Sequence, residues 1–236
     1  MNVYLRTGTS RTFRLKHAVL LYEDGAATFA TLHGIRSRDD AAPQLSAGRV
    51  VTTAFLHTLS KGLKRDIPPE ILPENVVMRT TEAIAWWTPA RQRPMFFRGA
   101  DPKAEALNGK IYPHPALVFL ISAKDLYVRA LSEEVRPRAD TRLKTAPYWN
   151  TDARGLVCQG DMRTPGEVSV GAIRGWEEAY FQSAFTHPSG AVRLTTHPKG
   201  FHGLWAELIG EREFPHGFLA DSKETLRDFI EARTGC

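Results

Sequence analysis

The stretch ALVFLISAKDLYVRAL, residues 116–131, constrains the fold more than any other part of the chain. Leu117 to Ile121 form an unbroken apolar run, which is typical of a strand buried on both faces. After a short turn at Lys124 and Asp125, residues 126–130 alternate between apolar and polar side chains, as a second strand would. The stretch therefore predicts an antiparallel hairpin in the core of the protein.

Other apolar runs predict further strands on the N-terminal side of this hairpin. Residues 11–35 have the pattern of a hairpin or meander, with a turn signal at Asp24-Gly25. The runs VVMRTTEAIAWWTP, residues 76–89, and RPMFFRG, residues 93–99, are also strand-like and rich in aromatic side chains. The tryptophans Trp86, Trp87, Trp149 and Trp176 are interpreted as core residues rather than as a binding platform.

Helical spacing occurs in three stretches, 50–65, 169–185 and 221–233. The last of these begins at Asp221 and has Glu224 three residues on, which is the pattern of a capping box. The expected buried faces are Val51, Phe55, Leu59 and Leu63 in the first stretch, Val170, Ile173, Trp176, Tyr180, Phe181 and Ala184 in the second, and Leu226, Phe229 and Ile230 in the third.

Residues 132–168 show little periodicity. A structureless segment of this length is uncommon in a compact domain and often carries function. The order of elements is hairpin, helix, antiparallel strands, irregular segment, helix, loop and helix. This order predicts an α+β fold and not an alternating parallel one.

Composition limits the classes of function. The chain has 236 residues with a net charge of +5, but its basic residues are scattered, so nucleic-acid binding is not predicted as the main function. No apolar run reaches membrane-spanning length and no secretory segment opens the chain, so a cytoplasmic protein is expected. The two cysteines, Cys158 and Cys236, form no disulfide framework and no zinc-binding spacing. Composition alone favours a buried, inert thiol at Cys158.

The neighbours of Cys158 favour a different role. The cysteine lies in PYWNTDARGLVCQGDM, residues 147–162, and Gln159, Gly160 and Asp161 follow it, so the chain leaves the core at once. Gly155 and Gly160 flank the thiol and permit close approach of another backbone. This arrangement is compatible with a nucleophile that accepts an acyl group.

The spacing around Cys158 resembles that of the ubiquitin-conjugating enzymes. In that family the catalytic cysteine lies eight residues after the asparagine of a His-Pro-Asn motif, and here Asn150 lies eight residues before Cys158 (158 − 150). Tyr148 and Trp149 stand where the family has His and Pro, which puts the support of this loop in question. A closer resemblance, to the bacterial PRTRC system protein B family, rests on AWWTPARQRPMFF, APYWNTDARGLVCQGDM and WEEAYFQSAFTHP.

The resemblance implies a ubiquitin-conjugating-enzyme-like fold, an antiparallel β-meander flanked by helices. Residues 49–236 would form this domain, and residues 1–48 would be an added N-terminal β-hairpin. The implied partners are a ubiquitin-like protein, a ThiF-type activating enzyme and a JAB-type peptidase of the same bacterial system. The resemblance implies no cofactor and no metal.

The same resemblance implies the roles of four residues. Cys158 would accept the C-terminal glycine of a ubiquitin-like protein as a thioester and pass it to an amine. Asn150 would act either as an oxyanion donor or as a brace for its loop. His187, in the loop THPSG after the second helix, or Asp161 would assist removal of the amine proton.

Three alternatives remain open at this stage. One is an inactive binding module of the same fold that holds a ubiquitin-like protein without a covalent bond. Another is a Cys-His hydrolase of ubiquitin-like conjugates that uses His187, His197 or His202, although Cys158 does not precede a helix, as the cysteines of such enzymes usually do. The third is a DNA-associated accessory factor.

Overall fold

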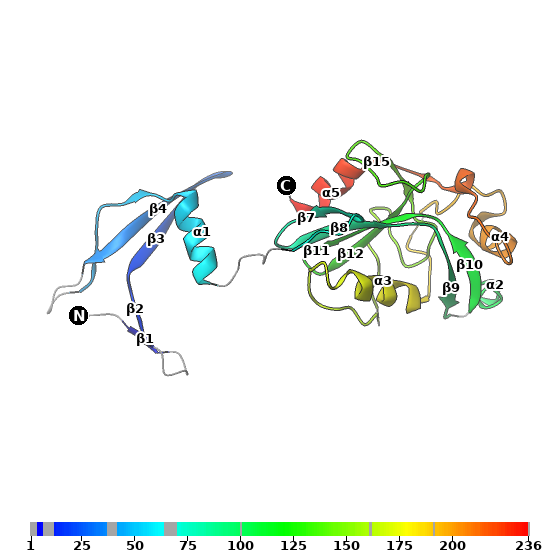
Figure 1. Cartoon of the computed structure of the whole chain (residues 1–236), viewed down its shortest axis with the longest axis horizontal. Coiled ribbons are helices and arrows are strands. Elements are labelled where there is room, and N and C mark those ends of the chain that lie inside the picture. The colour runs from blue at the N-terminus through cyan, green and yellow to red at the C-terminus, as the bar shows by residue number, and fades with distance from the viewer. Residues whose placement is uncertain are drawn as a thin grey trace. The chain divides into compact units, whose positions relative to one another are not determined.

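The computed structural model describes residues 4–6, 12–36, 42–63, 70–99, 101–160, 162–190 and 192–235. It contains two compact units, Met1–Pro68 and Pro69–Cys236 (Figure 1). The helix Thr53–Gly62 (α1) belongs to the first unit, where it packs on the N-terminal hairpin: Phe55 meets His17 edge-on at 6.2 Å between ring centroids.

The N-terminal unit is built on the predicted hairpin. Strands β3 (His17–Asp24) and β4 (Ala27–Arg36) pair around Gly25, whose φ of 58° is readily adopted by glycine. Short strands complete the unit: β5 (Gln44–Leu45) and β6 (Arg49–Val50) pair with β4, and β1 (Tyr4–Arg6) pairs with β2 (Thr12–Arg14). The predicted helix forms as α1, but no residue of it is buried, so its apolar stripe is not a core face.

A six-stranded antiparallel sheet forms the centre of the second unit. Its order is β15-β13-β12-β11-β8-β7. The bounds are Val76–Arg79 (β7), Ala83–Thr88 (β8), Leu117–Ser122 (β11), Asp125–Ala130 (β12), Arg142–Thr145 (β13) and Asp221–Thr225 (β15). The predicted central hairpin is confirmed as β11 and β12. Its turn is at Ala123-Lys124, because Asp125 already pairs with Ser122.

A smaller sheet adjoins this unit's core, in the order β10-β9-β14. Strands β9 (Arg91–Phe97) and β10 (Lys110–His114) are antiparallel, whereas β14 (Ala184–Phe185) runs parallel to β9. The prediction of an α+β fold with antiparallel sheets is confirmed with this one parallel exception. Residues 132–168 were expected to have little regular structure, but they contain the strand β13.

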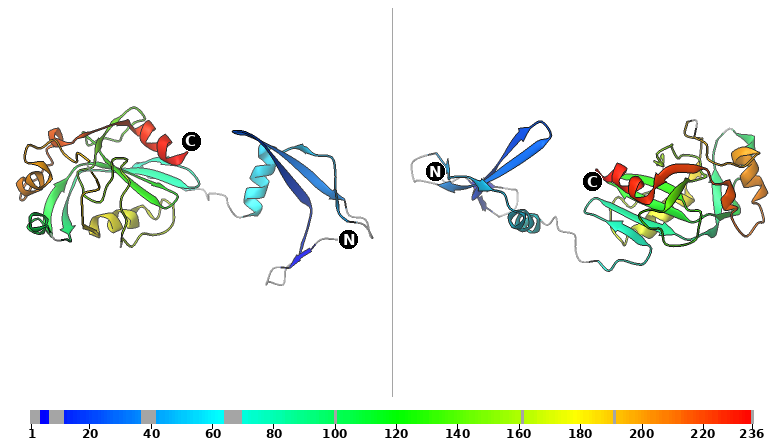
Figure 2. Two further views of the ribbon diagram at one scale, coloured as in Figure 1. Left: turned by 180° about the vertical axis from the view of Figure 1, so that it is seen from behind. Right: turned by 90° about the horizontal axis from the view of Figure 1, so that it is seen from above.

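Two helices cover opposite faces of the six-stranded sheet, α3 (Ile173–Gln182) and α5 (Leu226–Thr234) (Figures 1 and 2). Phe119 packs in one hydrophobic cluster with Trp176 of α3, while Val118, its neighbour in β11, packs in the other with Phe229 of α5. Both faces of β11 are therefore buried, as its unbroken apolar run predicts. Trp86, Trp149 and Trp176 are buried in the first cluster, which confirms their core role.

The start of the last helix was predicted wrongly. Asp221 lies in β15, opposite Lys144 of β13, so it is not a helix cap. The capping box is formed instead by Thr225 and Asp228. The short helices α2 (Pro102–Glu105), α4 (Gly200–Glu207) and η1 (His216–Phe218) were not predicted. In the described residues, no helix has the length and apolarity needed to cross a lipid bilayer.

Candidate functional site

The eight-residue spacing of Asn150 and Cys158 is explained by a small hairpin. Thr151 and Val157 form an antiparallel bridge, so the next residues outward stand opposite each other. The Cys158 N–H accordingly donates to the Asn150 carbonyl at 2.7 Å. A tight turn at Asp152 closes the hairpin, because its side chain accepts the N–H groups of residues 154 and 156 at 2.8 and 2.9 Å.

This hairpin is attached along strand β12. The Val157 N–H donates to the Leu126 carbonyl and the Val128 N–H donates to the Gly155 carbonyl, both at 2.8 Å. Glycine is required at 155, since its φ is 86° and an added Cβ would lie 2.7 Å from the Val128 oxygen. The buried Arg129 guanidinium also donates to the Ala153 carbonyl at 2.8 Å. The segment before Cys158 is thus held against the central sheet.

Cys158 itself is a free, exposed cysteine. The buried thiol that composition favours is therefore wrong, and the neighbouring residues gave the better indication. Val157 is buried, at 4% exposure, so the chain turns outward between these two residues. Gln159 holds the next step of the chain by donating to the Lys124 carbonyl at 2.7 Å. The hairpin therefore presents the thiol to solvent from a fixed backbone.

The Asn150 side chain joins this hairpin to the segment after α3. Its Oδ1 accepts from the Thr186 N–H at 3.0 Å and from the His187 N–H at 3.2 Å, and its Nδ2 donates to the Ala184 carbonyl at 3.2 Å. The Asn150 N–H also donates to the His187 carbonyl at 2.9 Å. Its φ of 57° is left-handed, a conformation in which asparagine is enriched. Asn150 thus links two segments far apart in sequence.

His187 is brought to the thiol-bearing hairpin by these contacts. Its ring is exposed, and its Nδ1 lies 2.8 Å from the Thr186 hydroxyl. That hydroxyl donates its single proton to Asn150 Oδ1 at 3.1 Å, so it accepts from His187 Nδ1–H. The neutral imidazole then carries its lone pair on Nε2, where it can take a proton. Asp161, the other predicted acid-base residue, lies outside the described residues.

Tyr148 supports the loop in place of the family's histidine. It is fully buried, and its ring stacks between His114 and Phe185, with interplanar angles of 12° and 19°. The Tyr148 hydroxyl donates to His114 Nδ1 at 2.8 Å, and His114 Nε2–H donates to the Arg93 carbonyl at 3.2 Å. Trp205 secures the start of the segment by donating to the Pro147 carbonyl at 3.1 Å. The departure from His-Pro therefore leaves this loop well supported.

The burial of His114 predicts an acid-dependent loss of stability. Desolvation lowers the pKa of His114 to about 3, although its hydrogen bond to Arg93 opposes the shift. The unfolded chain protonates this residue below about pH 6.5, whereas the folded chain stays neutral until about pH 3. The free energy of unfolding is therefore expected to fall as the pH drops through this window, by a few kcal/mol in order of magnitude.

Urea unfolding of the wild type and of His114→Phe/Tyr148→Phe, at about pH 7 and about pH 4, measures this contribution. The double variant keeps a stacked apolar pair and lacks the titrating ring, so it should lose less stability on acidification. Equal losses in the two proteins would show that His114 does not couple folding to pH.

The other two candidate histidines, His197 and His202, each lie beside a carboxylate. His197 is buried, with its Nε2 3.0 Å from the Glu207 carboxylate and its Nδ1 accepting from the Lys199 N–H at 3.2 Å. His202 lies beside the Asp101 carboxylate, at 2.9 Å. His202 also meets Trp149, the residue before Asn150, edge-on at 5.5 Å between ring centroids. No described contact joins either ring to Cys158 itself, which disfavours a Cys-His pair involving them. In the described part of the chain, no group of three or more His, Cys, Asp and Glu side chains could hold a metal ion.

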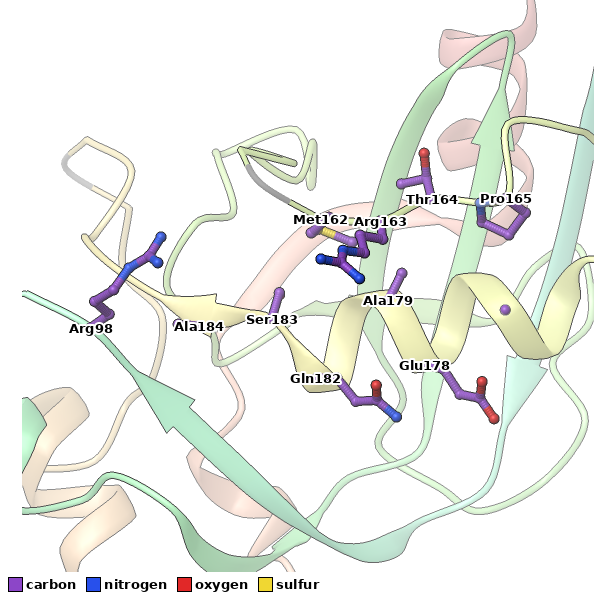
Figure 3. A pocket seen from close by; sticks show the side chains of 11 residues that line it. Arg98, Met162, Arg163, Thr164, Pro165, Glu178, Ala179, Gln182, Ser183 and Ala184 are labelled. Atoms are coloured by element: carbon purple, nitrogen blue, oxygen red, sulfur yellow. The ribbon is translucent and has the colours of Figure 1, made fainter.

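A groove of about 510 Å³ borders the segment that follows Cys158 (Figure 3). Residues 162–165 line one side, and α3 with the two residues that follow it lines the other. The two sides meet at Gly175, where an added Cβ would lie only 2.9 Å from the Pro165 ring. The groove reaches Ala184, the residue whose carbonyl binds Asn150.

Sequence reasoning missed the residues that support the site. His114 and Thr186 contact Tyr148 and Asn150 from positions more than thirty residues away, and nothing near either residue in the sequence identifies its partner. The PHP tripeptide, residues 113–115, is typical of an edge strand, but it does not identify Tyr148 as the partner of His114.

Comparison with known proteins adds one finding to this geometry. The sequence model of prokaryotic E2 family D matches residues 53–222. The match starts at α1, includes Asn150, Cys158 and His187, and ends within β15. No curated protein and no solved structure matches the chain.

Proposed function

The chain belongs to prokaryotic E2 family D, and from this premise we propose that it carries a ubiquitin-like protein as a thioester on Cys158 and transfers it to an amine. The observation that carries the proposal is the exposed thiol held opposite Asn150 by the hairpin 150–158. A rigid backbone and an open approach are what an acyl-accepting thiol requires.

Two acyl transfers make up the proposed reaction. The Cys158 thiolate attacks the carbonyl carbon of the C-terminal glycine, which is held as a thioester on the activating enzyme. The new S–C bond forms as the old one breaks, and the activating enzyme's thiolate leaves. An amine then attacks the same carbon, the N–C bond forms, and the Cys158 thiolate leaves. The amine proton passes to a base.

His187 is the proposed base. Its backbone contacts with Asn150 hold it beside the hairpin, and its bond to Thr186 leaves the lone pair on Nε2. An exposed imidazole in this tautomer is suited to take a proton from an incoming amine.

Asn150 is proposed to act first as a loop brace. Its Oδ1 accepts three hydrogen bonds and its Nδ2 already donates to Ala184. Asn150→Ala is expected to lower the free energy of unfolding by about 2–3 kcal/mol, because it removes these contacts and disfavours the left-handed backbone. Asn150→Asp keeps the three acceptor contacts but sets a carboxylate oxygen against the Ala184 carbonyl, so it should lose less stability than Asn150→Ala and still form the thioester.

The Asp variant also separates the two roles of Asn150. Stability is measured by urea unfolding and transfer by single-turnover discharge to free lysine. The rate of transfer to lysine could fall equally in Asn150→Ala and Asn150→Asp while the Asp variant remains stable. That result would show that the amide donor acts on the oxyanion and that bracing the loop does not explain the whole effect of Asn150 on transfer.

The finer assignments follow from the same proposal. We assign residues 49–236 to the ubiquitin-conjugating-enzyme-like fold, with residues 1–48 as an added N-terminal β-hairpin. We also place the protein in the PRTRC system B family, with a ThiF-type enzyme as its activating partner and a JAB-type peptidase in the same system. A free thiol suits the reducing conditions of the cytoplasm.

The test is incubation of the full chain with its activating enzyme, ATP and the ubiquitin-like protein, followed by a non-reducing gel. A larger band that disappears with reductant supports the proposal. If the activating enzyme becomes charged and no band forms on this chain, the proposal is wrong, and non-covalent binding of the ubiquitin-like protein then identifies a binding module. Cleavage of a purified conjugate by the chain alone identifies a hydrolase.

A further inference from the structure

Strand β3 is an edge strand among the described strands of the N-terminal unit. In the described part of the N-terminal unit its hydrogen-bonded neighbour is β4, and β3 ends the strand order. Natural edge strands are usually short, or are interrupted by proline, a bulge or a central charge. β3 has eight residues, and its central sequence AVLLY carries no proline and no charge. Such an edge is a template for another strand.

The backbone groups that face outward are fixed by the pairing with β4. The Ile35 N–H donates to the Lys16 carbonyl, so even-numbered residues of β3 bond to β4. In an antiparallel ladder the bonds alternate, and the groups of His17, Val19, Leu21 and Glu23 therefore point away from β4. These four positions are symmetric about Leu20.

We propose that β3 pairs antiparallel with β3 of a second copy of this chain, with Leu20 of each copy on the two-fold axis. In this register His17 bonds to Glu23 of the other copy and Val19 bonds to Leu21 of the other copy. The outward backbone groups of all four residues then form hydrogen bonds. A two-fold pairing centred on any other residue of β3 would leave at least one of the four without a partner. The two hairpins become one four-stranded sheet.

The charges of the strand fit this register. The sequence KHAVLLYED, residues 16–24, has a basic end, an apolar centre and an acidic end. Centring on Leu20 places Lys16 opposite Asp24 of the other copy and His17 opposite Glu23, so each basic residue meets an acidic one. Opposite charges facing each other across a strand pair stabilise it, and like charges destabilise it. The strand is thus complementary to itself.

The apolar side chains fit it as well. Val19 and Leu21 are 42% and 67% exposed and share one face, the face on which α1 packs. Pairing puts Val19 of one copy beside Leu21 of the other. On the opposite face Tyr22, exposed at 48%, comes to lie opposite Ala18 of the second copy. The contact is isologous, as in most two-fold dimers.

Charge reversal tests the register in the full chain by sedimentation velocity over a concentration series. Lys16→Glu and Asp24→Lys should each raise the dissociation constant of the dimer about tenfold or more, because each places two like-charged pairs across the axis. An equimolar mixture of the two variants should dimerise as well as the wild type, since every pair across the mixed interface is again opposite in charge. This recovery cannot come from a misfolded variant.

Cysteine cross-linking gives a second readout. In a Cys158→Ser/Cys236→Ser background, Leu20→Cys should form a disulfide-linked dimer on mild oxidation, because the two thiols would face each other across the axis. The matched control Thr28→Cys lies in β4 and should stay monomeric on a non-reducing gel.

Three results would overturn the proposal. One is a wild-type chain that sediments as a monomer at every concentration. Another is a dimer that survives either charge reversal or fails to recover on mixing. The third is cross-linking at Thr28→Cys as readily as at Leu20→Cys. Binding of a different protein to a monomeric wild type would assign the edge to that partner instead.

Discussion

Replacement of Cys158 by alanine is expected to abolish the reductant-sensitive adduct with the ubiquitin-like protein. The thiol is the proposed nucleophile, and an alanine side chain offers no atom that could hold the acyl group. The fold should be unaffected, because the Cys158 side chain is exposed and only its backbone N–H makes a described hydrogen bond. Cys158→Ser should instead form an ester that resists reductant and is cleaved by alkali.

The chain offers a matched control for this result. Cys236 is the other cysteine and the last residue of the sequence. Cys236→Ala should form the adduct at the wild-type rate on a non-reducing gel. An adduct that persists in Cys158→Ala, or disappears in Cys236→Ala, would contradict the assignment of Cys158 as the acceptor.

Tyr148→Ala is expected to have the largest effect on stability. The ring is fully buried, stacks on His114 and Phe185, and contacts Tyr180 edge-on. Its removal should lower the free energy of unfolding by about 3–5 kcal/mol, through lost burial and the cavity that remains. Thioester formation should also fall, since Asn150 and Cys158 are positioned by the segment that Tyr148 anchors.

Urea unfolding followed by tryptophan fluorescence measures this effect selectively. The five tryptophans of the chain all lie at or after residue 86, within the second unit, so the signal reports on that unit alone. The control Tyr148→Phe keeps the stacked ring and leaves His114 Nδ1 without its donor, so it should lose about 1–2 kcal/mol. Similar losses in the two variants would show that the hydroxyl, and not the ring, supports the loop.

Local patterns predicted several of the longer elements of the fold correctly. The hairpin of β11 and β12, the hairpin of β3 and β4, and the helix α3 each follow from apolar periodicity within one short stretch. The buried face of α3 was correct at Ile173, Trp176, Tyr180 and Phe181. Periodicity succeeds here because each side chain's direction is fixed by the local backbone.

The errors arose where distant partners decide the structure. Asp221 and Glu224 had the spacing of a capping box, but pairing with β13 holds residues 221–225 extended and moves the cap to Thr225. The strand β13 itself lacks a clear local signal, because it is short and its alternation covers four residues. Tertiary hydrogen bonds outweigh local propensity in both cases.

The candidate site divides in the same way. The residues around Cys158 were enough to match Asn150 and Cys158 to the family's eight-residue spacing and to indicate that the chain leaves the core after the thiol. The folded structure was needed to show that Asn150 and Cys158 face each other across a hairpin, that Tyr148 stacks on His114, and that Asn150 binds the backbone of His187. The last two contacts join residues more than thirty positions apart. Their partners are selected by packing around a shared core, and no local pattern of side chains encodes that choice.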